Sequence, residues 1–160
     1  MATVVWRAVA AAWPAWLLLA VVLALFETPR LWRAWRRRRA GLARIDAMSG
    51  EEFEAFLAQL FVRLGHRVER VGAGGGDFGA DLLLRDRDGA CFVVQAKRYT
   101  RPVGVKAVQE VLGARGYYQA DRAAVVTNST FTAAAVKLAQ ANDVDLWDRE
   151  QLAEAVRRSR

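Results

Sequence analysis

The longest hydrophobic stretch of the chain lies near its amino terminus. Residues 8–26 form nineteen consecutive positions without a charged side chain. At about 1.5 Å of rise per residue, a helix of this length matches the hydrocarbon core of a bilayer. Five of the six tryptophans lie within or beside this stretch, where amphipathic rings favour the membrane–water interface. The pattern predicts a membrane anchor over residues 1–29 that contains one transmembrane helix.

A second segment, residues 30–45, is rich in arginine. Seven arginines fall between Arg30 and Arg44, whereas only Arg7 and the terminal amine precede the hydrophobic stretch. The positive-inside rule therefore predicts a single-pass protein of the cell membrane whose carboxyl-terminal part lies in the cytoplasm. Residues 30–45 would be a basic juxtamembrane linker, which anionic lipid attracts by about 1 kcal/mol per basic residue.

The same segment has three alternative interpretations. A cleaved signal peptide carries its positive charge before the hydrophobic stretch, and here most of that charge follows it. A buried core helix needs a polar face separated from its apolar face, which the arginine run does not leave. The arginines could also bind nucleic acid, and this alternative stays open beside lipid attraction.

After residue 46 the hydrophobic positions follow the periods of helices and strands. Apolar residues between Phe53 and Leu64 recur at spacings of three and four, which is typical of an amphipathic helix. Ser49 is placed to cap its start and Gly65 to end it. The remaining elements are predicted as strands over 67–71, 80–85 and 90–98, a helix over 103–118, a strand over 123–127, a helix over 132–141, a strand over 144–147 and a helix over 149–157. This order predicts an α/β fold with one mixed central sheet flanked by helices on both faces.

Composition and charge narrow the class of protein. The chain is 54% hydrophobic with three prolines, which excludes a disordered chain. A single cysteine, Cys91, and a single histidine, His66, exclude a disulfide framework and a zinc site built on these residues. Of the 24 basic and 17 acidic residues, eight and one lie in residues 1–45, which leaves sixteen of each sign in residues 46–160. The net charge of +7 therefore does not describe a globular domain coated in positive charge.

A glycine-rich segment covers residues 72–79. The glycine spacing of residues 74–79 matches that of a dinucleotide-binding loop, but the segment precedes a predicted strand and not a helix. No Gly-Lys-Ser/Thr sequence follows, so a P-loop is excluded as well. We expect a sharp turn that brings Asp77 and Asp81 near a polyanionic substrate.

Three polar residues gather on the predicted hairpin of residues 80–98. Asp81 starts one strand, and Gln95 and Lys97 share one face of the next because side chains alternate along a strand. An amide and an ammonium at the end of an apolar strand need polar partners, and Asp81 is the natural one. Together they could hold a hard divalent cation and a phosphate. Taken alone, these residues also fit an ordinary Asp–Lys ion pair.

The motifs around these residues resemble a known nuclease family. Asp81 followed by Gln95-Ala96-Lys97 is similar to the D-x(n)-(D/E/Q)-x-K signature of the PD-(D/E)xK nuclease superfamily, and more narrowly to the Q-x-K variant of the Mrr-type restriction endonuclease catalytic domain. The likeness extends over about residues 46–150. The resemblance implies a restriction-endonuclease-like core and an Mrr-like nuclease domain over residues 46–160. The segments that carry it are 52–54, 64–66, 76–81, 95–99, 125–128 and 131–135.

The resemblance also implies an activity: metal-dependent endonucleolytic cleavage of DNA with Mg²⁺ or Mn²⁺, in restriction of foreign or modified DNA. By this resemblance Asp81 and Gln95 would contact the metal. Lys97 would activate water or stabilise charge, and Glu54 of the first helix would supply a further carboxylate at the metal. The alternatives are a catalytically weak nucleic-acid-binding module and a membrane-tethered scaffold with the same fold.

Further polar residues are candidate contacts to the DNA backbone, because they follow the catalytic strand or precede a later helix. An exposed loop and a helix cap are the plainer interpretations of the same residues. The expected partners are thus DNA and the lipid bilayer, the latter through residues 8–26, with a homodimer left open. The candidate DNA contacts are Arg98, Tyr99, Arg101, Thr127 and Asn128.

Overall fold

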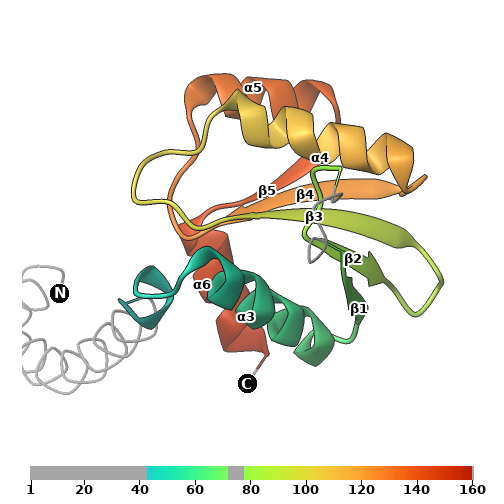
Figure 1. Ribbon diagram of the computed structural model, residues 1–160, viewed down its shortest axis with the longest axis horizontal. Coiled ribbons are helices and arrows are strands. Elements are labelled where there is room, and N and C mark those ends of the chain that lie inside the picture. The colour runs from blue at the N-terminus through green and yellow to red at the C-terminus, as the bar shows by residue number, and fades with distance from the viewer. Residues whose placement is uncertain (1–42, 72–77, 160) are drawn as a thin grey trace, which may run out of the picture. The chain divides into compact units, whose positions relative to one another are not determined.

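The computed structural model describes residues 43–71 and 78–159 (Figure 1). The predicted transmembrane helix and nearly all of the arginine-rich linker lie outside the described residues, as does Asp77 of the glycine-rich segment. Within the described ranges, no helix is both long and apolar enough to span a bilayer. Residues 42–160 form one compact unit.

The centre of the unit is a five-stranded mixed sheet in which the strands lie in sequence order (Figure 1). The first three strands pair antiparallel, whereas β3, β4 and β5 pair parallel. The predicted mixed sheet is therefore confirmed. The strands are β1 (Arg67–Arg70), β2 (Leu82–Arg85), β3 (Cys91–Lys97), β4 (Arg122–Thr127) and β5 (Val144–Trp147).

Helices cover both faces of the sheet (Figure 1). Helices α3 (Gly50–Arg63) and α6 (Arg149–Arg158) pack on one face, and α4 (Val105–Tyr117) and α5 (Ala133–Ala141) on the other. Side chains of β3 alternate between the two cores. Val93 is buried with α4, and Val94 is buried with α3. This alternation directs the odd-numbered residues of β3 toward α4.

The local signals read from the sequence explain most element ends. Ser49 Oγ accepts from the Glu52 backbone N at 3.1 Å, and Glu52 Oε2 accepts from the Ser49 backbone N at 2.7 Å, so α3 begins with a capping box. Gly65 follows α3 with a φ of 98°. Helix α4 begins at Val105 and not at Val103, because the Val103 backbone pairs with the chain before α5, donating to Thr130 O at 2.8 Å.

Candidate active site

Asp81 and Gln95 meet beside the junction of β2 and β3. The register pairs Leu82 with Val94, so Asp81, one residue before β2, lies beside Gln95. Asp81 Oδ2 accepts from Gln95 Nε2 at 2.5 Å and from the Ala96 backbone N at 2.6 Å. Asp81 is 7% exposed and Gln95 is 4% exposed. Two donors on one buried carboxylate oxygen offset part of the cost of its desolvation.

Lys97 lies on the same face of β3 as Gln95 and contacts a carboxylate of α4. Its Nζ is 2.8 Å from Glu110 Oε2, and the two side chains are 19% and 29% exposed. A second lysine, Lys106, reaches the other oxygen of Glu110 at 3.8 Å, but its side chain is 87% exposed. Glu110 therefore holds the Lys97 ammonium in a defined, half-buried position.

Glu110 was not selected from the sequence, although a signal for it exists. The apolar residues of α4 that face the sheet include Ala107, Val111 and Ala114. Glu110 is three residues after the first of these and four before the last, so the helical period places it beside this inward stripe. A partly buried carboxylate at such a position is stabilised by a nearby positive charge, and the Lys97 ammonium provides it.

Glu54 lies elsewhere. It is carried by α3, which covers the face of the sheet opposite to α4. Its Oε2 is 3.4 Å from Arg70 Nη2 of β1. The structure thus brings together Asp81 and Gln95, and joins Lys97 to Glu110, but it does not bring Glu54 to Lys97. A role of Glu54 at a metal stays a prediction.

The segment that leads into Asp81 rests on α4 at Gly79. This glycine has a φ of 90°, and a Cβ added to it would lie 2.3 Å from the carbonyl oxygen of Glu110. Only a residue without a side chain permits this close approach of the two backbones. The contact fixes the approach to Asp81 against the helix that positions Lys97.

Gly79→Ala is expected to destabilise the fold by about 2–5 kcal/mol, because a left-handed backbone and a clash add together. Gly89 is the matched control, since its φ is 87° but a Cβ there would meet nothing within 4 Å. Gly89→Ala should cost only the backbone term of about 1–2 kcal/mol. Urea denaturation followed by circular dichroism measures both, and equal losses would show that the contact with Glu110 is not tight.

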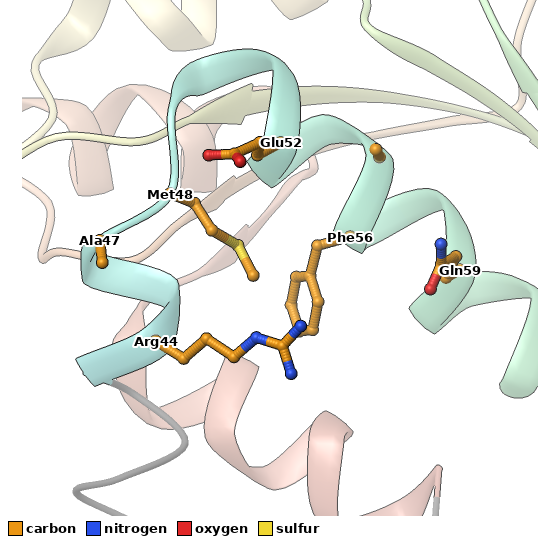
Figure 2. Close-up of a pocket in the computed structure, with 7 residues that line it drawn as sticks. Arg44, Ala47, Met48, Glu52, Phe56 and Gln59 are labelled. Carbon is orange, nitrogen blue, oxygen red and sulfur yellow. The ribbon is translucent and has the colours of Figure 1, made fainter.

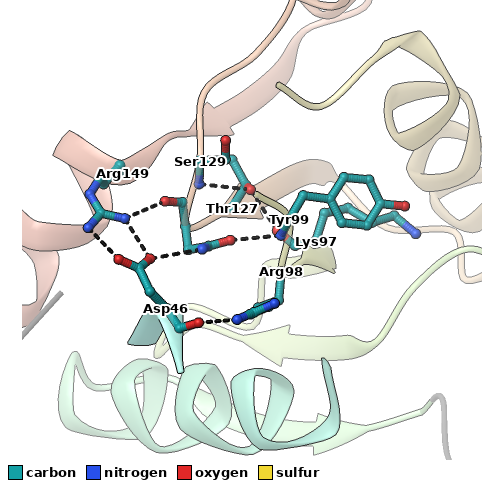
Figure 3. A network of polar contacts seen from close by, with 8 residues as sticks. Asp46, Lys97, Arg98, Tyr99, Thr127, Ser129 and Arg149 are labelled. Atoms are coloured by element: carbon teal, nitrogen blue, oxygen red, sulfur yellow. Dashed lines mark hydrogen bonds and ion pairs between the residues drawn. The ribbon is translucent and has the colours of Figure 1, made fainter. Parts of the chain in front are cut away.

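A polar network holds the chain at the end of β3 (Figure 3). Arg149 Nη1 and Nη2 donate to Asp46 Oδ1 and Oδ2 at 2.6 and 2.7 Å. Asn128 Nδ2 donates to the same carboxylate at 3.0 Å, and Asn128 Oδ1 accepts from the Tyr99 backbone N at 2.8 Å. The hydrogen bonds from Arg149 hold the pKa of Asp46 below its ordinary value, and Asp46 raises the pKa of Arg149.

Residues predicted to contact DNA take part in this network. Thr127 Oγ1 donates to the Lys97 backbone O at 2.6 Å, and the Arg98 guanidinium donates to the Asp46 backbone O. Thr127 and Asn128 are 0% and 4% exposed, so their visible role is to fix the backbone beside Lys97. Tyr99 and Arg101 are exposed. Contacts of these five residues with DNA stay predictions.

The donor set at Asp81 can be compared with the needs of a divalent cation. Among residues 43–71 and 78–159, no cluster of three or more His, Cys, Asp or Glu side chains could hold a metal ion. Mg²⁺ keeps several waters and binds through one or two carboxylates together with substrate phosphates. The Asp81 carboxylate and the Gln95 amide oxygen are hard donors that suit a cation bound in this way.

A shallow hollow of about 420 Å³ lies beside α3 (Figure 2). In it the Arg44 side chain points toward the Phe56 ring, and Met48 lies between α3 and the short helical segment that precedes it. None of the residues that line it belongs to the predicted site. The lining residues are Arg44, Ala47, Met48, Glu52, Ala55, Phe56 and Gln59.

Comparison with protein families assigns the domain. The family model of the Mrr catalytic domain, described as a restriction endonuclease, matches residues 45–156. The chain belongs to this restriction endonuclease family. The matched range of this Mrr-type domain contains Asp81, Gln95 and Lys97, together with Glu110. No curated protein sequence matches the chain.

Solved structures share the fold of this Mrr-type domain. The DNA modification-dependent restriction endonuclease AspBHI is similar with a TM-score of 0.59 and 21% identity, over 77% of this chain and 36% of that one. MspJI restriction endonuclease, solved in complex with a 27-mer oligonucleotide, has a TM-score of 0.55 and 18% identity, over 77% and 31%. AF1548, a protein of unknown function, gives 0.50 and 19%, over 59% and 55%. The chain thus spans about a third of the two restriction endonucleases and about half of the third protein.

Proposed function

We propose that the chain is a divalent-metal-dependent DNA endonuclease whose catalytic residues are Asp81, Gln95 and Lys97. The observation that carries the proposal is the buried Asp81–Gln95 contact with Lys97 on the same strand face, two residues further along. A buried carboxylate, a buried amide and a half-buried ammonium lie close together here. Their removal from water has a free-energy cost that an apolar strand end would avoid. Such an arrangement in a restriction endonuclease domain fits phosphodiester hydrolysis.

Each residue has a distinct role in this proposal. The Asp81 carboxylate and the Gln95 amide oxygen would hold Mg²⁺ or Mn²⁺, with Glu54 as a further predicted ligand. When bound, the cation would supply positive charge to the scissile phosphate and acidify a water. Lys97 lies two residues, or about 6.6 Å of strand, beyond Gln95, and its ammonium would stabilise the negative charge that develops on the phosphoryl oxygens. Glu110 would fix the ammonium before substrate arrives.

DNA is the proposed substrate, and restriction of foreign or modified DNA is the proposed context. Two proteins of the same fold support this choice. MspJI was solved in complex with an oligonucleotide, and AspBHI is described as dependent on DNA modification. Both are longer than this chain, so the likeness supports a nuclease core and does not extend to recognition of a particular sequence or modification.

The proposal is tested by incubating the full chain with supercoiled plasmid DNA. We expect nicked and then linear plasmid with Mg²⁺ or Mn²⁺, and intact plasmid when a chelator is in excess. Cleavage that persists undiminished in chelator would contradict the metal requirement. Intact plasmid with every divalent cation would contradict the endonuclease itself.

A DNA-binding module with little cleavage is the second candidate. It is favoured by the small number of carboxylates around Asp81 in the described part of the chain, because one acid binds Mg²⁺ more weakly than two or three. Such a module would retain plasmid in a salt-sensitive binding assay without cutting it.

We also propose that residues 8–26 anchor the domain in the cell membrane and that residues 30–45 face the cytoplasm. The charge difference across the hydrophobic stretch supports this orientation. A reporter enzyme fused after Arg160 should therefore report a cytoplasmic location. Neutralising Arg36–Arg39 and adding lysines before Val4 should invert part of the population. A periplasmic or extracellular signal from the unaltered chain would contradict the anchor.

A further inference from the structure

Two exposed aromatic side chains stack on each other beside the proposed active site. The rings of Phe78 and Tyr117 have centroids 3.8 Å apart and planes inclined by 18°. Phe78 is 54% exposed and Tyr117 is 58% exposed, so neither ring belongs to a core. Tyr118, the residue after α4, packs edge-on against Tyr117 with ring centroids 4.9 Å apart. This contact restricts the orientation of the Tyr117 ring.

The pair is tied to the elements that carry the catalytic residues. Phe78 immediately precedes Gly79, whose backbone rests against Glu110, and Asp81 follows two residues later. On α4, Glu110, Gly113 and Tyr117 recur at spacings of three and four, so they lie on one side of the helix. A Cβ at Gly113 would lie 3.8 Å from the Phe78 carbonyl oxygen. The segment of Phe78 and Gly79 therefore runs along α4 from the Lys97 partner to the aromatic pair.

The backbone at Phe78 is held in an unusual conformation. Its φ is 45°, a left-handed value that bulky side chains rarely adopt. Burial of the residue does not compensate for this cost, because Phe78 as a whole is more than half exposed. Strained residues of this kind cluster at binding and catalytic sites. In this conformation the side chain of Phe78 is exposed at the edge of the proposed active site.

We propose that Phe78 and Tyr117 form a stacking platform for a nucleobase of the DNA strand that is cut. The inference rests on the proposed endonuclease function. Seven residues of helix separate Glu110 from Tyr117, a distance of about 10.5 Å. This corresponds to at most about three nucleotides, because the rise of about 3.4 Å per nucleotide in a duplex strand is the shorter spacing. The base stacked on the outer face of Phe78 is therefore within about three nucleotides of the phosphate at Lys97.

The platform would favour DNA that contains an unpaired base. A base inside a duplex is already stacked on its neighbours, so a base that reaches Phe78 must be unpaired or turned out of the helix. The chain should therefore bind single-stranded DNA, or a duplex with an unpaired base near the cut, more tightly than a perfect duplex. Because the rings carry no charge, their contribution to affinity should leave the salt dependence of binding unchanged.

The test measures binding of the full chain to a fluorescent single-stranded oligonucleotide by anisotropy, in chelator so that no cleavage occurs. Phe78→Leu and Tyr117→Leu keep apolar side chains but remove the aromatic faces, and each should weaken binding by roughly tenfold or more. The slope of log affinity against log salt should stay the same. Val62→Ala, a change of a 57%-exposed apolar residue on α3, is the control that should bind as the parent does.

A second readout reports stacking itself. 2-Aminopurine placed at successive positions of the oligonucleotide should be quenched at one register by the parent chain, and the quenching should disappear in Phe78→Leu. Unchanged affinity and quenching in both leucine variants would overturn the platform. So would a fall in oligomeric state of the DNA-free protein with unchanged DNA affinity, because the pair would then be a contact between copies of the chain. Failure of the parent to bind the oligonucleotide, with plasmid still cleaved, overturns the platform alone. Intact plasmid with every divalent cation overturns the endonuclease, whatever the oligonucleotide binding.

Discussion

Lys97→Ala is expected to lose DNA cleavage while it binds DNA nearly as well as the parent chain. Removal of a fixed group that stabilises charge in the transition state typically costs on the order of a hundredfold or more in rate. Glu110 keeps a second lysine partner and is 29% exposed, so the variant should remain folded. Single-turnover cleavage and equilibrium binding, measured on one preparation, separate rate from affinity.

Lys106 is the matched control, because it contacts the same carboxylate but its side chain is 87% exposed. Lys106→Ala should keep most of the cleavage rate, and if the ammonium meets a phosphate the salt slope should fall by about one. The catalytic assignment would be wrong if Lys97→Ala lowered affinity while cleavage at saturating protein stayed unchanged. Lys97 would then be a contact to the DNA backbone.

Asp81→Asn is expected to abolish cleavage and to leave the domain folded. The substitution keeps size and shape, and one amide oxygen can still accept from the Ala96 backbone N or from Gln95. The loss of stability should be about 1–2 kcal/mol, which is the scale of an altered buried hydrogen bond. What disappears is the single buried carboxylate of the Asp81–Gln95 pair, and with it the affinity of this pair for a hard cation.

Asp121→Asn tests the specificity of that effect. Asp121 Oδ2 accepts from the Cys91 backbone N at 2.8 Å, so a carboxylate also holds the opposite end of β3. Its replacement should lower the stability by a comparable amount but leave cleavage intact.

Gln95→Glu restores the commoner acid of the superfamily signature and should retain some activity with a changed metal preference. Full cleavage by Asp81→Asn would remove Asp81 from the mechanism.

Much of the fold could be predicted from local periodicity. The stripe from Phe53 to Leu64 and the cap at Ser49 predict α3 almost to the residue, because helix ends depend on neighbours a few positions away. Strand alternation likewise predicts that Gln95 and Lys97 share a face, and the hairpin predicts that Asp81 lies beside Gln95.

The remaining parts of the site depend on contacts between distant segments. Glu110 reaches Lys97 only through the packing of α4 on the sheet, which no spacing along the chain encodes. Asp46 and Arg149 are 103 positions apart, and the pair has no local signature. A helix cap was the plainer interpretation of Thr127 and Asn128, but Thr132 caps α5, accepting from the Ala135 backbone N at 3.2 Å. The Thr127 hydroxyl instead donates a hydrogen bond to the Lys97 backbone O.

In the proposed mechanism, Asp81 and Lys97 of this chain carry out the cleavage of DNA. The most direct test is the single-turnover cleavage rate of an end-labelled DNA with Mg²⁺, at saturating protein, for the parent chain, Asp81→Asn and Lys97→Ala prepared in parallel. We predict measurable cleavage by the parent and a loss of a hundredfold or more in both variants. Equal rates in all three preparations would contradict the claim, because the activity would then come from another site or another protein.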